Sequence, residues 1–201
     1  MYCISKMEKN NLTSREKTHK GWASTEAGIV GLVALVAVVL VISKAGGLFS
    51  SSDLTTEASN IQEIMTKTQG YLKMNAGYGF SSAAEMTGRL IQTKGTPKGM
   101  NIQGDPTSGE ATLWNTWGGA VTIEPTSSSG GFNNAFTLTY SAVPQEACIA
   151  LVTRIGGNGT ARSISINGSN HDAGSITQSV AGKECNIVTS AGNLLKLTSY
   201  N

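Results

Sequence analysis

The sequence predicts an α+β protein in which one long N-terminal helix packs on an antiparallel β-sheet. An apolar run near the N-terminus gives way to an amphipathic helical pattern after residue 52, and segments rich in β-branched residues follow from residue 120 onward. The 201 residues suffice for one packed domain with appended segments. With 24 glycines, 6% aromatic and 14% charged residues, the composition indicates an exported protein rich in loops and β-structure rather than a cytosolic helical enzyme.

The first element is a basic head, residues 1–21, with five lysines and arginines against two glutamates. The formal net charge of +2 depends on this head, because the remainder of the chain carries ten basic and eleven acidic residues, a net charge of −1. A near-neutral body gives no electrostatic basis for general nucleic-acid binding. We therefore expect no nucleic-acid partner.

An apolar helix follows the head. Its centre, Ala27–Ile42, is a run of sixteen consecutive residues without a charged or strongly polar side chain. As a helix, residues 22–42 would extend roughly 30 Å, about the thickness of the hydrocarbon core of a bilayer. The basic head favours a topology in which the head stays in the cytoplasm and the rest of the chain crosses the membrane.

This apolar segment has a second interpretation, a secretory signal peptide. Such a peptide is cut after its apolar run, where residues 43–47 of this chain are mostly small. The length of the basic head argues against it, and so does the carboxylate of Glu26 at the start of the apolar run. An acidic group in that place is costly in lipid and needs a function.

The next element is an amphipathic helix that starts near Asp53, with Ser52 as its expected N-cap. A stripe for burial recurs at alternating spacings of four and three residues: Leu54, Ala58, Ile61, Met65, Thr68 and Leu72. The charged residues, Glu57 among them, are expected mostly elsewhere on the helix. The glycines of residues 70–79 end it, and Gly46 and Gly47 predict a bend between its apolar and amphipathic halves.

The remaining elements are shorter. Residues 75–109 are polar and punctuated by glycine, which predicts a connecting loop with one short helix at residues 81–91. A second short helix is expected at residues 147–155. The predicted strands are residues 120–123, 135–140, 163–166 and 194–198, with a turn at Asn167-Gly168 after the third.

The three cysteines divide between the head, which has Cys3, and the second half of the chain, which has Cys148 and Cys185. Removal of the head would leave an even pair. A disulfide between these two would fit an oxidising compartment and contribute roughly 4 kcal/mol by the chain-entropy model. Two unpaired buried thiols are the alternative.

The segment Lys20-Gly21-Trp22-Ala23-Ser24-Thr25-Glu26, with the apolar run after it, resembles the prepilin-peptidase site of type IV prepilins. In that family the leader ends in glycine, the peptidase cuts after it, and the fifth residue of the mature chain is glutamate. The resemblance implies cleavage between Gly21 and Trp22, with Glu26 as the fifth residue. The family usually methylates the new amino terminus.

The 21-residue leader and the first mature residue, Trp22, resemble the type IVb branch, and in particular the PilS-like major pilins. The segments Asn115-Thr116-Trp117-Gly118-Gly119 and Val143-Pro144-Gln145-Glu146-Ala147-Cys148 suggest the same branch. The resemblance implies a pilin fold with three parts: a cleaved leader (1–21), a hydrophobic transmembrane and polymerisation helix (22–52), and a globular domain (53–201). It also implies a disulfide-bounded region at 148–185, whose loops at Asn158-Gly159 and Asn170-His171-Asp172 are expected to be exposed.

Glu26 has an expected role in assembly. A carboxylate inside an apolar helix bundle is tolerable only when it is paired, and the new α-amino group of a neighbouring subunit is a suitable partner after cleavage. A simpler role is that Glu26 stabilises the helix N-terminus, with Ser24 or Thr25 as N-cap. The two roles are compatible.

No residue pattern predicts catalysis. The mature chain would retain one histidine, His171, which is expected to be a solvated loop residue, and no nucleophile elbow, Walker loop or paired Cys-x-x-Cys motif occurs. Trp114 and Trp117 flank a turn and are expected to pack in a core or interface. We therefore expect no catalytic residue, no cofactor and no metal site.

The resemblance implies the major structural subunit of a type IVb pilus, held in the inner membrane as a precursor and then assembled into an extracellular filament. Its expected partners are other pilin subunits, prepilin peptidase, and a receptor on a host or recipient cell. The filament would serve adhesion, aggregation or conjugative contact. The alternatives are a minor pilin or pseudopilin, and a membrane-anchored binding domain that does not polymerise.

Overall fold

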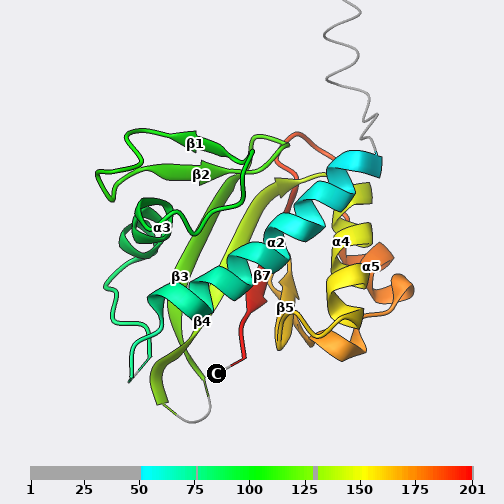
Figure 1. Cartoon of the computed structure of the whole chain (residues 1–201). Coiled ribbons are helices and arrows are strands. Elements are labelled where there is room, and N and C mark those ends of the chain that lie inside the picture. The colour runs from blue at the N-terminus through cyan, green and yellow to red at the C-terminus, as the bar shows by residue number, and fades with distance from the viewer. Residues whose placement is uncertain (1–50, 76, 129–130, 201) are drawn as a thin grey trace, which may run out of the picture. The chain divides into compact units, whose positions relative to one another are not determined.

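The computed structural model describes residues 51–75, 77–128 and 131–200. The predicted leader (1–21) and the predicted apolar helix up to residue 50 therefore lie outside the described residues. Within the described ranges the chain forms one antiparallel sheet with helices packed against it (Figure 1). This confirms the expected α+β class.

The sheet has seven strands in the order β1-β2-β3-β4-β7-β5-β6. Strand β4 is the longest, and its central part pairs with β3 on one side and β7 on the other. The bounds of the strands are β1 Asn101–Gln103, β2 Thr112–Trp114, β3 Ala120–Ser128, β4 Gly131–Val143, β5 Ser163–Ile166, β6 Ser169–Asp172 and β7 Asn193–Thr198.

Helix α2, Ser51–Leu72, crosses in front of β3, β4 and β7, between α3 and α4 (Figure 1). The predicted stripe is confirmed for Ala58, Ile61, Met65, Thr68 and Leu72, which are all at most 4% exposed, whereas Leu54 is only partly buried against the core. Full burial of each large apolar side chain contributes about 1.5–3 kcal/mol, so burial of this stripe stabilises the packing of α2 on the domain. The prediction missed the burial of Glu57, Asn60 and Ile64 on the same helix.

Helix α3, Ala83–Gln92, begins with reciprocal capping. The Ser82 hydroxyl accepts a hydrogen bond from the backbone N–H of Glu85 at 3.2 Å, and the Glu85 carboxylate accepts from the backbone N–H and hydroxyl of Ser81. The hydrogen bond from the Ser81 hydroxyl, followed by that from its backbone, lowers the pKa of Glu85. The helix predicted at residues 81–91 is thus confirmed.

Helix α3 also protects an open strand edge. Strand β3 pairs with β2 only through Ala120 and Val121, so its later residues lack a strand partner on that side. The hydroxyl of Thr87 from α3 accepts a hydrogen bond from the backbone N–H of Ile123 at 2.9 Å. Pro125, further along β3, has no backbone N–H to leave unpaired.

Helices α4, Gln145–Gly157, and α5, Gln178–Glu184, lie in the region that the predicted disulfide bounds. The expected strands at 120–123, 135–140, 163–166 and 194–198 are confirmed, although β3 and β4 are longer than predicted. The prediction that residues 75–109 form a loop with only a helix was incomplete, because β1 lies there. Strands β1 and β2 have three residues each, too few to show a periodic pattern.

Strand β6 and helix α5 were also missed. The sequence of β6, Ser-Asn-His-Asp, has no apolar alternation. It is a strand because the Asn167-Gly168 turn, with φ values of 51° and 96°, folds it back on β5. Helix α5 buries only Ala181 and depends on its N-cap, Thr177, whose hydroxyl accepts from the N–H of Val180.

Candidate functional site

The predicted cleavage site, Gly21 and Trp22, and the predicted assembly residue, Glu26, lie outside the described residues. Their roles stay predictions. Within residues 51–75, 77–128 and 131–200, no helix has both the length and the apolar character needed to cross a membrane.

The disulfide between Cys148 and Cys185 is formed. Cys148 lies in the first turn of α4 and Cys185 caps the end of α5. Their Cα atoms are 5.8 Å apart across a sequence separation of 37 residues, and both side chains are fully buried. The predicted pairing is confirmed, and the alternative of two free thiols is wrong.

The segment Asn115–Gly119 forms the turn between β2 and β3. The side-chain oxygen of Asn115 accepts hydrogen bonds from the backbone N–H groups of Trp117 and Gly119, at 3.0 and 2.8 Å. Its amide nitrogen donates to the carbonyl of Ser141, near the end of β4, at 2.9 Å. A side chain at Gly119 would collide with that carbonyl, so only glycine permits this approach. The motif therefore fastens the turn to β4.

Glu57 joins helix α2 to the same turn, and it is 1% exposed. One carboxylate oxygen accepts from the backbone N–H and the hydroxyl of Thr116, at 2.7 and 2.5 Å. The other accepts from the phenol of Tyr140 at 3.3 Å and from the amide of Asn60 at 3.2 Å. Four donors thus compensate the desolvation of this carboxylate.

The environment of Tyr140 reflects this contact. Burial, followed by the negative charge and hydrogen bond of Glu57, raises the pKa of the Tyr140 phenol well above its ordinary value. Sequence reasoning placed Glu57 away from the buried stripe. Its spacing of four residues from Ile61 would have put it on the buried face. Because a carboxylate is rarely buried, its charge led to the prediction that it lies elsewhere on the helix.

The segment Val143–Cys148 starts at the same end of β4, where the chain leaves the strand and enters α4. The pairing of β4 with β7 is irregular between Tyr140 and Val143, and Ala142 has a φ of 52°. The side chain of Asn193, which is fully buried, donates to the carbonyls of Val143 and Ile187, at 3.0 and 3.1 Å. The two motifs that suggested the type IVb branch thus meet at the end of β4, where an asparagine fastens a loop on each side.

His171 is not the solvated loop residue that was expected. It lies on β6, and its ring Nε2 is 2.7 Å from a carboxylate oxygen of Glu184, with the two side chains only 22% and 20% exposed. This pair ties the edge of the sheet to the end of α5. The exposure predicted for Asn158-Gly159, Asn170 and Asp172 is confirmed. Among the described residues, no group of three potential metal ligands occurs.

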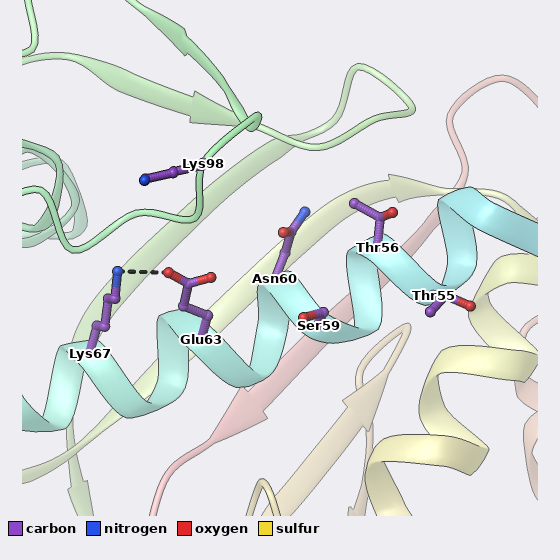
Figure 2. A pocket seen from close by; sticks show the side chains of 7 residues that line it. All are labelled: Thr55, Thr56, Ser59, Asn60, Glu63, Lys67 and Lys98. Carbon is purple, nitrogen blue, oxygen red and sulfur yellow. Dashed lines mark ion pairs between the residues drawn. The ribbon is translucent and has the colours of Figure 1, made fainter.

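A polar hollow of about 420 Å³ lies along the outward face of α2 (Figure 2). Hydroxyl and amide side chains of the helix line it, beside the Lys67–Glu63 ion pair at 2.6 Å and the ammonium of Lys98. The hydrogen bond to Glu63 raises the pKa of Lys67. The hollow contains no nucleophile next to a general base, so its described residues offer no catalytic arrangement.

The two tryptophans near the turn differ in their contacts. The indole N–H of Trp114 donates to the hydroxyl of Thr112 at 3.0 Å, and Trp117 packs against the core.

Comparisons with known proteins give a consistent result. The family model described as PilS N terminal matches residues 51–199. A crystal structure of a type IVb pilin from Salmonella typhi is 43% identical, with a TM-score of 0.63, and the match covers 73% of this chain and 99% of that one. An NMR structure of the type IVb pilin PilS from the same organism is 42% identical, with a TM-score of 0.52, over 75% of this chain and 98% of that one.

A more distant structure shows the same fold alone. The crystal structure of TcpA, a type IV pilin from Vibrio cholerae El Tor biotype, is 14% identical, with a TM-score of 0.50, over 75% of this chain and 100% of that one. The comparison with curated proteins gives no match.

Proposed function

Because the chain belongs to the PilS family of type IVb pilins, we propose that it is the major structural subunit of a type IVb pilus. It is a structural pilin, not an enzyme. The observation that carries the proposal is the match over nearly the whole of a solved type IVb pilin domain at 43% identity.

The proposal includes the processing of the chain. The leader, residues 1–21, is removed by prepilin peptidase between Gly21 and Trp22. Residues 22–52 then serve as membrane anchor and polymerisation helix, and residues 53–201 form the domain on the filament surface. The basic leader, the apolar run and the position of Glu26 support this division.

Glu26 is proposed to pair with the new amino group of a neighbouring subunit. The domain supports such an assembly mechanically, because Glu57 and the buried stripe attach α2 firmly to the sheet. The finished filament is proposed to act in adhesion, aggregation or contact between mating cells.

Analysis of filaments sheared from cells tests the proposal. We expect this chain to be their predominant protein, and Glu26→Val to be inserted and cleaved but to give no filaments, whereas Glu26→Asp retains some assembly. A trace amount among another predominant pilin would indicate the minor-pilin alternative. Normal pili from Glu26→Val would contradict the assembly role.

A further inference from the structure

The chain has two Asn-Gly dipeptides, Asn158-Gly159 and Asn167-Gly168. Asparagine before glycine is especially prone to spontaneous deamidation, because glycine has no side chain to hinder the attack of its backbone nitrogen on the asparagine side chain. Both dipeptides lie between Cys148 and Cys185, in the region that the disulfide bounds. The two sites share the same local chemistry, so a difference in their reactivity must come from the fold.

The reaction at Asn158 needs only the chain itself and water. The backbone nitrogen of Gly159 loses its proton and attacks the side-chain carbon Cγ, so that an N–Cγ bond forms. The Cγ–Nδ2 bond breaks, and the amide nitrogen takes up the proton and leaves as ammonia. Water then opens the succinimide ring at either of its two carbonyl carbons, which gives aspartate or isoaspartate.

Asn158 holds its reacting amide in the open. It ends helix α4, and both it and Gly159 are exposed. Its side-chain oxygen accepts hydrogen bonds from the backbone N–H and the hydroxyl of Thr160, at 3.1 and 2.5 Å. No described residue accepts a hydrogen bond from its side-chain nitrogen, which is the group that leaves. Water therefore reaches the leaving group directly.

The attack also requires the peptide between Asn158 and Gly159 to rotate. The ψ of Asn158 is 3°, which places the Gly159 nitrogen beside the asparagine's own backbone nitrogen rather than its side chain. Apart from the adjoining chain, no atom lies within 4 Å of the position that a Cβ would take at Gly157 or Gly159. Two glycines with open space around them permit this rotation.

Asn167 is fastened to two other elements. Its side-chain nitrogen donates to the carbonyl of Glu184, the last residue of α5, and to the side-chain oxygen of Asn193, at 2.8 and 2.9 Å. Its side-chain oxygen accepts from the backbone N–H of Leu194 in β7 at 2.9 Å. Its own backbone N–H donates to the carbonyl of Leu194, also at 2.9 Å. Loss of ammonia here first requires these contacts to break.

The products also fit the two places unequally. A carboxylate at residue 167 would have no N–H to donate, and its oxygens would face the carbonyl of Glu184 and the side-chain oxygen of Asn193. A carboxylate at residue 158 could still accept both hydrogen bonds from Thr160. The fold thus opposes the reaction at one dipeptide and permits it at the other.

We propose that Asn158 is a site of spontaneous deamidation, and that its hydrogen bonds protect Asn167 from the same reaction. Each conversion adds one negative charge at the exposed end of α4. The isoaspartate product also lengthens the backbone by one CH2 group. The extent of conversion would record the age of the folded protein. This inference does not depend on the proposed function, because it concerns the folded domain and not its assembly.

Peptide mapping by mass spectrometry tests the proposal. The full-length chain in detergent, with its disulfide intact, is kept in mildly alkaline buffer and digested at intervals in mildly acidic buffer. Trypsin cuts after Arg154, Arg162 and Lys183, so the two sites fall in different peptides. Asn158 is the only amide side chain in residues 155–162, and fragmentation locates the change in residues 163–183.

We expect deamidation to be at least about ten times faster at Asn158 than at Asn167, because hydrogen bonds must break at Asn167 before ammonia leaves. The same chain, reduced and unfolded in denaturant, is the matched control, since it keeps both sequences and removes the hydrogen bonds. There the two rates should be similar. A ratio in the folded protein that is no larger than in the unfolded chain would overturn the proposal.

Two variants identify the groups involved. Asn158→Gln should abolish the mass change in residues 155–162, because its longer side chain closes a ring much more slowly. A change that persists in that peptide would overturn the assignment of the site.

Asn193→Ala removes one acceptor of the Asn167 amide, so it should raise the rate at residue 167 and leave that at residue 158 unchanged. A folded variant with an unchanged rate at residue 167 would overturn the protective role of this contact. If the variant does not fold, the comparison of the folded and unfolded unaltered chain decides alone.

Discussion

On one side of β4 the sheet continues through β3, β2 and β1, which neighbour one another in the chain as well as in space. On the other side the order is β7, β5 and β6, so the last strand of the chain lies between β4 and β5. The first side requires only short loop closures. The second requires residues 193–198 to pair with strands that are far away in sequence.

The two sides of β4 also differ in the contacts that hold them to the rest of the domain. Each has a buried asparagine that bonds a loop to the end of β4, Asn115 on the first side and Asn193 on the second. The first side adds the carboxylate of Glu57, a non-covalent link from α2 to the β2–β3 turn. The second adds the Cys148–Cys185 disulfide. The covalent link thus lies on the side of β4 where strand pairing is less local, and it restricts the unfolded chain there.

Among the changes that test the difference between the two sides, loss of the disulfide should reduce the stability of the domain most. For the Cys148→Ala/Cys185→Ala variant of the domain from Ser51 onward, we expect a loss of about 4 kcal/mol in the free energy of unfolding. Hydrogen exchange should quicken first in β5, β6 and α5, and later in α3 and β3. Equal acceleration on both sides of β4 would contradict the idea that the disulfide protects one side.

Removal of the Glu57 carboxylate, on the first side of β4, should cause the next largest loss of stability. Glu57→Ala leaves the N–H of Thr116 and the phenol of Tyr140 without their acceptor, so we expect a loss of about 3 kcal/mol in urea unfolding. Glu63→Ala, on the exposed face of α2, is the control and should change stability by less than about 0.5 kcal/mol. A loss no larger than that of the control would mean that Glu57 does not anchor the helix.

The two asparagines offer a sharper comparison. Asn115→Ala and Asn193→Ala should each cost about 2 kcal/mol in the oxidised domain, because each leaves buried backbone groups unpaired. In the variant without the disulfide, the loss of unfolding free energy caused by Asn193→Ala should change, because Asn193 and the disulfide hold the same loop. The loss caused by Asn115→Ala should stay the same. A double-mutant cycle measures the difference. Additive effects for both asparagines would remove the distinction between the two sides.

Alkaline pH should produce an effect that is absent at neutral pH. Burial raises the pKa of Tyr78 to about 12, and burial with the charge of Glu57 raises that of Tyr140. Because the folded state holds these protons more tightly than the unfolded state, stability is unaffected below about pH 10. Above it, stability should fall by up to about 1.4 kcal/mol per pH unit for each tyrosine.

Thermal unfolding between pH 8 and pH 11 measures this decline. Tyr140→Phe should make it shallower, since that variant has one fewer phenol to ionise. An unfolding temperature that is unchanged over the range would show that neither phenol is as deeply buried as the fold requires.

Periodicity and local chemistry predicted the parts of the fold that depend on them. The buried stripe of α2, the short helix at residues 81–91 and the central strands were all predicted from the sequence pattern. Predicting the disulfide required only counting the cysteines that remain when the head is left out. These features are local, or depend on one pair of residues.

The parts that were missed depend on tertiary contacts. Glu57 can be buried because four donors surround it, two from Thr116, one from Tyr140 and one from Asn60 of its own helix, and the sequence does not reveal that the two distant residues meet it. His171 belongs to a polar strand that exists because β5 offers an edge, and its partner Glu184 comes from α5. Strands β1 and β2 are three residues long, too short for a sequence pattern, and form through pairing with their neighbours and burial of Leu113.

The most direct test of the pilus-subunit account is the intact mass and N-terminal sequence of the protein sheared from the cell surface. We expect a chain that begins at Trp22 and is two hydrogens lighter than its reduced form, which would combine prepilin processing, the Cys148–Cys185 disulfide and export in one molecule. A chain that begins near Ala45 would instead mean cleavage of an ordinary signal peptide, and would contradict assembly through the N-terminal helix.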